Sequence, residues 1–333
     1  MTDFRTIVSV AQSGHKVTIS DKIVTTGSCF ADVIGKKLAE SKVETIDNPF
    51  GNIYNPLSIH KALQYSTLNQ PPPEDTFLQR EGLCLNFDFH SEISDTSEVN
   101  LTQRISGIIA TTHDFLKDAQ WLVITYGTAW VYTRNDNGMV VGNCHRVPAK
   151  SFSKSILTNA QIEDSFGQLY SQLKELNPLL RVILTVSPVR HIKDTLELNS
   201  VSKATLLTSC YNIVRNFPDV QYFPAYEIMI DDLRDYRFYQ SDMLHPTPVA
   251  EDYIWKKFTT SYFTQSLLDF VEQFHEIRLA LNHRPFHPNT TGHYNFLTET
   301  LRKLKILSGI VDVEIEIGQI NQQLDQIKQK MPS

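Results

Sequence analysis

Short apolar runs alternate along this chain with longer segments in which apolar residues recur every three or four positions. The short runs have the length of strands and are rich in valine, isoleucine, threonine and aromatic residues; they cover residues 23–26, 121–126, 181–187 and 220–224. The segments with helical spacing cover residues 31–41, 159–176, 200–216 and 248–262. Strands that alternate with amphipathic helices are typical of a parallel sheet with helices on both faces. The pattern therefore predicts an α/β fold.

Two regions do not follow this alternation. Residues 64–104 contain three consecutive prolines and a stretch rich in serine, aspartate and glutamate, which predicts a surface insertion. Beyond Phe263 the strand pattern stops and the spacing becomes helical. We therefore expect a domain of residues 1–265, with the insertion at about 64–104, and a helical C-terminal extension of residues 266–333.

The end of the chain has apolar residues at a 3,4 spacing from Ile310 to Met331. Residues 311–317 also fit the two-residue period of a strand, and spacing alone does not separate the two interpretations. A helical apolar face has to be covered. It can fold back as a hairpin on a helix that contains Leu297 and Leu304, which the turn residues Ser308 and Gly309 favour, or it can pair with a second chain in a homo-oligomer through the C-terminal helices.

Composition narrows the classes of function. The chain has 333 residues, 31 basic and 37 acidic, so its formal net charge is −6. This balance argues against nucleic acid as a partner, because phosphate neutralisation needs a basic surplus. No stretch approaches the ~20 apolar residues of a membrane span, the first residues do not resemble a secretory leader, and the four cysteines form no CxxC pair. We expect a reduced, cytoplasmic protein without a membrane span.

A glycine and a serine follow the first predicted strand. Phe30, Ile34 and Leu38 share one face of the next helix, so Ser28 lies where the strand passes into a helix N-terminus. This place suits a nucleophile, because the unpaired N–H groups of the first helical turn stabilise a developing oxyanion. The alternative is that Ser28 only caps the helix.

A second candidate lies close to the predicted helix of residues 248–262. Asp242 and His245 are three residues apart and are followed by two prolines, at positions 246 and 248. A carboxylate this close can accept a hydrogen bond from one imidazole nitrogen and leave the other nitrogen to take a proton from a serine. A DxxH pattern alone is common by chance, and a surface histidine is the ordinary alternative.

Together, the Gly-Ser unit near the start and the DxxH before the last α/β helix resemble the SGNH or GDSL hydrolase superfamily. Residues 27–31 spell GSCFA, the motif after which the GSCFA family is named. Further blocks resemble that family in their expected order: residues 48–56, 126–128, 144–145, 185–189, 199–204 and 222–227. The resemblance covers about residues 20–265 and implies an SGNH-hydrolase-like three-layer sandwich with a mostly parallel sheet.

The resemblance also implies a catalytic triad and an oxyanion hole. Ser28 would be the nucleophile, His245 the general base and Asp242 the residue that orients His245. In the superfamily the oxyanion is bound by the serine N–H, by a glycine N–H, here that of Gly51, and by an asparagine side chain.

Two positions depart from the superfamily pattern. The third block has Gly-Thr-Ala-Trp at residues 127–130 where GxND is expected, so the side chain of Thr128 or Asn52 would replace the missing asparagine. Gly27 stands where the superfamily has aspartate.

The sequence gives weaker support for functional roles of several other residues. Arg190 and His191 are expected to line the substrate cleft, since they follow a predicted strand whose carboxyl end gathers ligands, and an exposed loop is the alternative. Trp130 is expected to shape the acyl or glycan pocket, and core packing is the alternative. Cys29 would be the attacking group if the helix N-terminus lowered its pKa, and a buried inert thiol is the alternative. The histidines at 145, 283, 287 and 293 are better explained as structural or surface residues than as ligands. We expect no metal and no organic cofactor.

These observations favour a serine esterase that cleaves a small ester, such as an O-acyl group on a carbohydrate or related metabolite, by a Ser-His-Asp covalent mechanism. An acyltransferase would use the same residues. The alternative from another class is a non-catalytic scaffold that binds a glycan or peptide on the same fold, because the missing asparagine would weaken transition-state binding more than ground-state binding.

Overall fold

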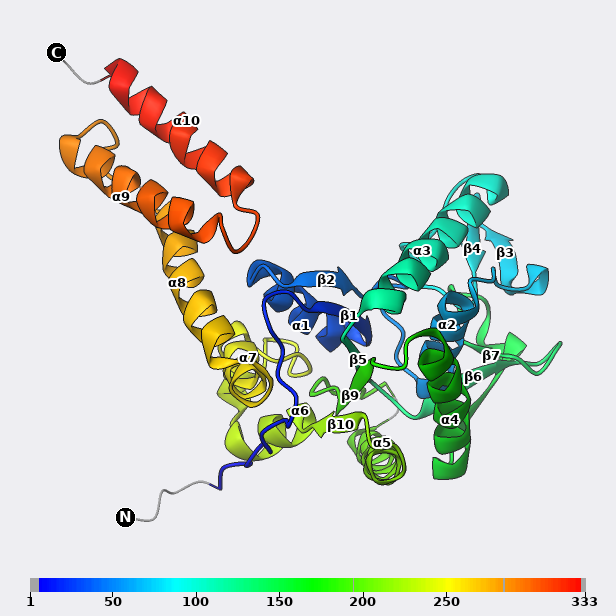
Figure 1. Cartoon of the computed structure of the whole chain (residues 1–333). Coiled ribbons are helices and arrows are strands. Elements are labelled where there is room, and N and C mark those ends of the chain that lie inside the picture. Colours follow the sequence, from blue (N-terminus) through cyan, green and yellow to red (C-terminus); the bar gives the residue numbers. More distant parts are fainter. Residues whose placement is uncertain (1–5, 194, 284, 331–333) are drawn as a thin grey trace.

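A five-stranded parallel sheet forms the centre of the protein, whose computed structural model describes residues 6–193, 195–283 and 285–330 (Figure 1). The strand order is β10 (Val220–Phe223), β9 (Arg181–Val186), β5 (Trp121–Tyr126), β1 (Lys22–Gly27) and β2 (Glu44–Asp47). The four predicted strands are confirmed. The sequence pattern missed β2, because this strand is at the sheet edge, has the polar sequence ETID and is only partly buried.

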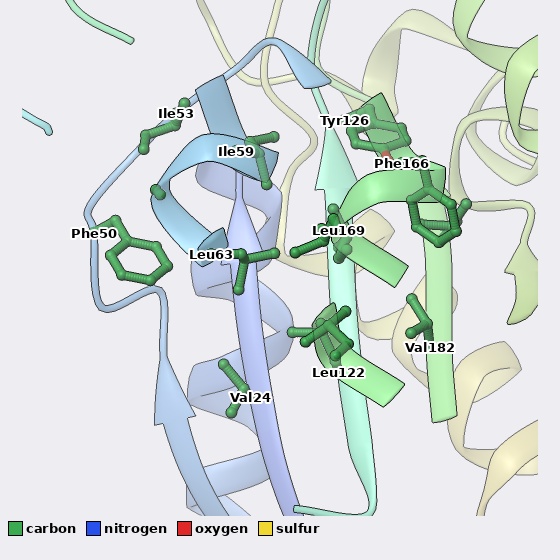
Figure 2. Close-up of a cluster of buried hydrophobic side chains, with 14 of the residues drawn as sticks. Val24, Phe50, Ile53, Ile59, Leu63, Leu122, Tyr126, Phe166, Leu169 and Val182 are labelled. Atoms are coloured by element: carbon green, nitrogen blue, oxygen red, sulfur yellow. The ribbon is translucent and has the colours of Figure 1, made fainter. Parts of the chain in front are cut away.

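Helices cover both faces of this sheet, as predicted. The larger helices of the α/β unit are α1 (Cys29–Glu40), α2 (Pro56–Leu68), α3 (Glu98–Asp118), α4 (Asn159–Leu176), α5 (Leu196–Asn216) and α7 (Pro248–Tyr262), with the short α6 (Ala225–Glu227) after β10. Adjacent strand residues point to opposite faces. Val24 and Leu122 therefore pack against α2 and α4, as Figure 2 shows, whereas Ile23 and Val123 pack on the side of α1 and α7. The result is a three-layer α/β sandwich.

The segment predicted as a surface insertion is more deeply integrated than its composition indicates. It contains the antiparallel hairpin of β3 (Phe77–Arg80) and β4 (Leu83–Asn86). Phe89 and Ile93 after this hairpin are buried in the same core cluster as the central strands. The local abundance of polar residues concealed these apolar anchors.

A second small sheet lies after β5. It has the order β7 (Val140–Val141), β6 (Trp130–Arg134) and β8 (Phe152–Ile156), and its strand pairs are antiparallel. Trp130 and Tyr132 belong to β6, whereas Tyr126 ends β5 of the central sheet. The three aromatic residues of this stretch are therefore divided between two sheets.

The C-terminal region is helical, with α8 (Gln265–Asn282), α9 (Thr291–Leu307) and α10 (Glu314–Lys330). Figure 1 shows α9 and α10 side by side and antiparallel, the hairpin arrangement. Leu304 of α9 and Ile320 of α10 are buried in the cluster that covers the α1 face. Residues 314–317 are helical, so the strand interpretation is wrong there; Met331 lies outside the described residues. The division of the chain at residue 265 stays a prediction.

Among the described residues, no helix combines the length and apolar character that a membrane span requires.

The burial pattern of α10 yields a direct test of the hairpin. We expect Ile320→Ala to destabilise the α9–α10 hairpin by roughly 2–4 kcal/mol, because the Ile320 side chain is fully buried and its truncation leaves a cavity. Hydrogen exchange of the α9 and α10 amides measures this loss. Ile315→Ala is the matched control on the same helix, since Ile315 is 71% exposed and its truncation should change protection little. Equal effects of the two substitutions would contradict this packing.

Candidate active site

Gly27 fixes the start of the site by packing tightly against the neighbouring strand. It lies opposite Thr125 of β5 in the parallel register, with a φ of +131°. A Cβ at this position would lie 2.1 Å from the Thr125 carbonyl oxygen, so any side chain would collide with β5. An aspartate side chain, which the resemblance leads one to expect at this position, would therefore not fit here.

Ser28 is the N-cap residue of α1 but does not cap the helix with its side chain. The residue is fully buried, and its Oγ has no hydrogen-bond partner in the described part of the chain. The interpretation of the Ser28 side chain as a helix cap is therefore wrong. A buried hydroxyl without a partner is energetically unfavourable. Helix capping therefore does not explain why a serine is present at this position.

Asp242 and His245 form the hydrogen-bonded pair that their spacing predicts. His245 Nδ1 and Asp242 Oδ2 are 2.6 Å apart, and Asp242 Oδ1 accepts from the backbone N–H groups of Leu244 and His245 at 2.8 and 3.1 Å. These hydrogen bonds lower the pKa of Asp242 to about 2, and the bond with the His245 imidazole has the largest effect. Asp242 is thus ionised at neutral pH and orients the ring through Nδ1.

Ser28 and His245 are not in hydrogen-bond contact, since Ser28 Oγ lacks a partner among the described residues. The side chains of His245 and Asp242 are 43% and 42% exposed, whereas Ser28 is buried. The two parts of the proposed triad are therefore not joined by a hydrogen bond between the described residues.

His191 lies against the Ser28 half of the site. A Cβ placed on Gly127 would meet His191 Nε2 at 3.1 Å, Tyr54 Cδ1 at 3.1 Å and Ser28 Cβ at 3.2 Å, so these three side chains surround one point. Burial, followed by the charges of Lys203 and His245, lowers the pKa of His191 to about 3. The imidazole is therefore neutral at physiological pH, and its Nε2 has no partner in the described part of the protein.

Arg190 supports the His245 turn instead of facing Ser28. Its backbone N–H donates to the Leu244 carbonyl at 3.3 Å, and its guanidinium lies 3.9 Å from the ring centroid of Tyr239. This cation–π contact and the backbone bond fasten the loop after β9 to the turn that contains Asp242 and His245.

The predicted oxyanion donors are arranged differently from the expectation. The N–H of Ser28 donates to the Thr125 carbonyl at 3.0 Å, and the N–H of Gly51 donates to the Asn48 carbonyl at 2.8 Å. In this structure neither group is available to a substrate. Gly51 has a φ of +69°, and a Cβ on it would lie 2.4 Å from His90 Cβ, so the turn itself requires glycine.

Thr128 and Asn52, the two side chains expected to replace the missing asparagine, differ in whether they have a free hydrogen-bond donor. Thr128 Oγ1 is bonded to Ser202 Oγ at 3.0 Å and accepts from the N–H of Trp130. Asn52 Oδ1 accepts from Asn48 Nδ2 at 3.1 Å, whereas Asn52 Nδ2 donates no hydrogen bond among the described residues. Asn52 is thus the predicted donor that is still available.

Two residues that the sequence analysis missed organise the surroundings of Ser28. Asn48 Oδ1 accepts from the Gly27 N–H at 3.0 Å, which ties the loop after β2 to the end of β1. Lys203 of α5 is fully buried, and its Nζ donates to the carbonyls of Gly127 and Ser187 at 2.8 and 2.7 Å. A lysine at an apolar position of a predicted helix, in line with Leu206, Cys210 and Ile213, was the available signal.

Cys29 does not have the environment of a reactive thiol. Burial, followed by the nearby charge of Asp32, raises its pKa to about 11. The thiol is therefore protonated at neutral pH, which contradicts a nucleophilic role for Cys29.

Comparison with protein families identifies the chain. The model of the GSCFA family matches residues 22–258, and that of the C-terminal domain of GSCFA domain proteins matches residues 274–326. The chain belongs to the GSCFA family. No curated protein matches its sequence.

Two solved structures are similar to this GSCFA family member at 10% identity. One is provisionally described as a platelet activating factor from Streptococcus pneumonia; it has a TM-score of 0.38 and covers 72% of this chain and 83% of its own. The other is a carbohydrate esterase family 3 protein from Talaromyces cellulolyticus, with a TM-score of 0.34 and coverages of 76% and 98%. The family match, and not these structures, identifies the chain.

The packing of Gly27 leads to a prediction for this family member. We expect Gly27→Ala to lower the free energy of unfolding by at least ~3 kcal/mol, because the added Cβ would overlap the Thr125 carbonyl in a backbone conformation that alanine avoids. Urea denaturation measures the effect. Gly107→Ala is the control: Gly107 lies within α3 with open space around it, so alanine there should stabilise the protein by up to ~1 kcal/mol. An unchanged stability of Gly27→Ala would refute the close β1–β5 contact.

The buried Lys203 leads to a prediction about pH. Burial lowers its pKa to about 7 from an ordinary value near 10.5, so between these values the unfolded chain binds a proton that the folded chain does not. This group therefore makes stability rise as pH increases from about 7 towards 10. Lys203→Met removes the contribution, so the stability of the wild type relative to Lys203→Met should increase over that interval. Parallel urea titrations at pH 7, 8 and 9 measure it, and a pH-independent difference would contradict the assignment.

Proposed function

We propose that this protein is a serine ester hydrolase in which Ser28 is the nucleophile, His245 the general base and Asp242 the residue that orients the base. The observation that carries the proposal is the 2.6 Å Asp242–His245 pair, together with a buried serine hydroxyl at the strand–helix junction that has no hydrogen-bond partner among the described residues. The proposed substrate is a small ester, such as an O-acyl group on a carbohydrate or related metabolite. The family membership supports this proposal.

The reaction follows from the chemistry of these groups. His245 Nε2 takes the proton from Ser28 Oγ as the oxygen attacks the ester carbonyl, and ionised Asp242 stabilises the imidazolium. His245 then returns the proton to the leaving alkoxide, which departs as an alcohol. Water attacks the acyl-enzyme with the same base, releases the carboxylic acid and restores Ser28.

A local rearrangement has to precede this reaction, because Ser28 is buried and His245 is not hydrogen-bonded to it. Catalytic hydrogen bonds are often long or poorly aligned before substrate binds. The element that would move is the turn of Asp242 and His245, which is half exposed and carries the strained Met243, with a φ of +59°. The Asn52 amide is the proposed side-chain donor to the oxyanion, since its Nδ2 is uncommitted.

The hydrogen bonds of two backbone N–H groups favour a second candidate function, a non-catalytic scaffold that binds a glycan or peptide. The N–H groups of both Ser28 and Gly51 are bonded to backbone carbonyls, so the predicted oxyanion hole is not formed. Loss of such donors weakens the binding of a transition state more than that of a ground state.

Covalent labelling distinguishes the two candidates. If the protein is a serine hydrolase, a fluorophosphonate probe should label Ser28, and Ser28→Ala should lower kcat for a short-chain aryl ester at least ~10³-fold. His245→Ala should be comparably severe, and the double variant little worse, because members of one catalytic unit are not additive. Tryptic peptide mass spectrometry locates the label.

Cys29→Ala is the matched control, since it changes the adjacent residue without touching the proposed triad. It should retain labelling and turnover. If the folded wild type is not labelled, the result favours the scaffold. If the losses of kcat in the Ser28→Ala/His245→Ala variant are multiplicative, His245 acts elsewhere.

A further inference from the structure

We propose that a cavity beside Ser28 binds an anionic sugar unit, one that carries a carboxylate, phosphate or sulfate group. This cavity, called here the β6 cavity, has a volume of about 490 Å³ and is lined by Tyr54, Trp130, Tyr132, Arg146, His191 and Lys193, among others. Its volume is in the range of small-molecule sites, ~300–1,000 Å³. The assignment of this unit to an ester substrate rests on the proposed function, whereas the binding itself does not.

The position of the β6 cavity connects it to the candidate active site. Tyr54 and His191 line the cavity, and both also lie, together with Ser28 Cβ, within 3.2 Å of the point where a Cβ on Gly127 would be. A ligand in the cavity would therefore lie beside Ser28, separated from it by these two side chains. The cavity is thus placed to hold a part of a substrate that does not react.

The charges that line the β6 cavity select the sign of its ligand. Two exposed cationic residues, Arg146 and Lys193, line the cavity. Among the lining residues that the structure describes there is no aspartate or glutamate. His191 is neutral, because burial lowers its pKa to about 3. The excess of positive charge favours an anion.

Aromatic rings and uncommitted polar atoms indicate a sugar as the carrier of that charge. Trp130 and Tyr132 lie on β6 two residues apart and therefore present their rings on the same face of the small sheet. Trp130 Nε1 and His191 Nε2 are both buried and have no hydrogen-bond partner among the described residues. Buried polar atoms are normally paired, and the hydroxyl groups of a ligand would pair these two. Rings with nearby hydrogen-bonding groups suit a sugar, which has both apolar C–H faces and hydroxyl groups.

A matched pair of ligands tests the proposal without turnover. The probes are methyl β-D-glucuronide and methyl β-D-glucoside, which differ by a carboxylate in place of a hydroxymethyl group, and glucose 6-phosphate tests phosphate as the source of charge. With the folded Ser28→Ala protein at low salt, the glucuronide or the phosphate should bind at least ~10-fold more tightly than the glucoside in isothermal titration, as expected for a charge-assisted hydrogen bond. Inorganic phosphate alone should bind more weakly than glucose 6-phosphate, because it lacks the ring.

Variants of residues that line the cavity locate the site. Lys193→Met and Arg146→Met should each lower the preference for the anionic probe several-fold, and Trp130→Phe should weaken all sugars while it retains the preference for charge. Lys256→Met is the control, because Lys256 is an exposed lysine on α7 and does not line the cavity. Equal affinity for glucuronide, glucose 6-phosphate and glucoside, or equal losses in Lys256→Met and Lys193→Met, would overturn the proposal.

Measurements of ester hydrolysis distinguish an error in this inference from an error in the proposed function. Comparison of kcat/KM for O-acetylated methyl glucuronide and O-acetylated methyl glucoside should show the same preference in the wild type. Binding of the anionic probes that is lost in Lys193→Met, without labelling of Ser28, would support the β6 cavity and refute the esterase. Hydrolysis of both acetyl esters at equal kcat/KM, with no difference in binding, would support the esterase and refute the anionic site.

Discussion

The contact between Gly27 and the carbonyl of Thr125 is the constraint on which the candidate site depends. Because glycine lacks a Cβ, β1 approaches β5 at its carboxyl end more closely than any other residue would allow. Ser28 is the next residue, and its N–H is donated to the same Thr125 carbonyl. The serine is thereby positioned by the backbone of the sheet, so its side chain is not needed to hold the start of α1.

The loops around Ser28 are joined by polar side chains buried beneath them. Asn48 connects the loop after β2 to Gly27, and Lys203 connects the loops after β5 and β9 through two carbonyl groups. A buried ammonium is costly unless it is hydrogen-bonded, and the lowered pKa of Lys203 expresses this cost. These residues do not touch the proposed reacting atoms. They position the loops that bring Gly127 and His191 next to Ser28.

The candidate site thus has a more buried half and an exposed half. Ser28, Tyr54 and His191 pack around Gly127 at the end of the sheet, whereas the Asp242–His245 pair lies on a turn that Arg190 fastens to the loop after β9. The β6 cavity adjoins the buried half, because Tyr54 and His191 also line the cavity.

Much of the fold could be predicted from the sequence, because the central strands and their helices are marked by local patterns. The predicted bounds of four strands and of the helices of residues 159–176 and 248–262 agree closely with the observed bounds. The reason is that each of these elements buries a continuous apolar run or face. The hydrogen-bonded Asp242–His245 pair was likewise predictable, because three residues of chain suffice to form it. Membership of the GSCFA family was evident from the motif of residues 27–31.

Other features depended on contacts between residues distant in the sequence. Spacing did not show that the N–H of Gly51 is donated to Asn48, or that burial and Asp32 raise the pKa of Cys29, because a helix N-terminus alone would lower it. Nor did it reveal β2, whose polar residues form a strand only through pairing with β1. The sequence by itself determined which residues could carry the chemistry. Only the tertiary structure decided which of their hydrogen-bonding groups are already used and which residues adjoin Ser28, because burial and pairing are properties of the packed chain.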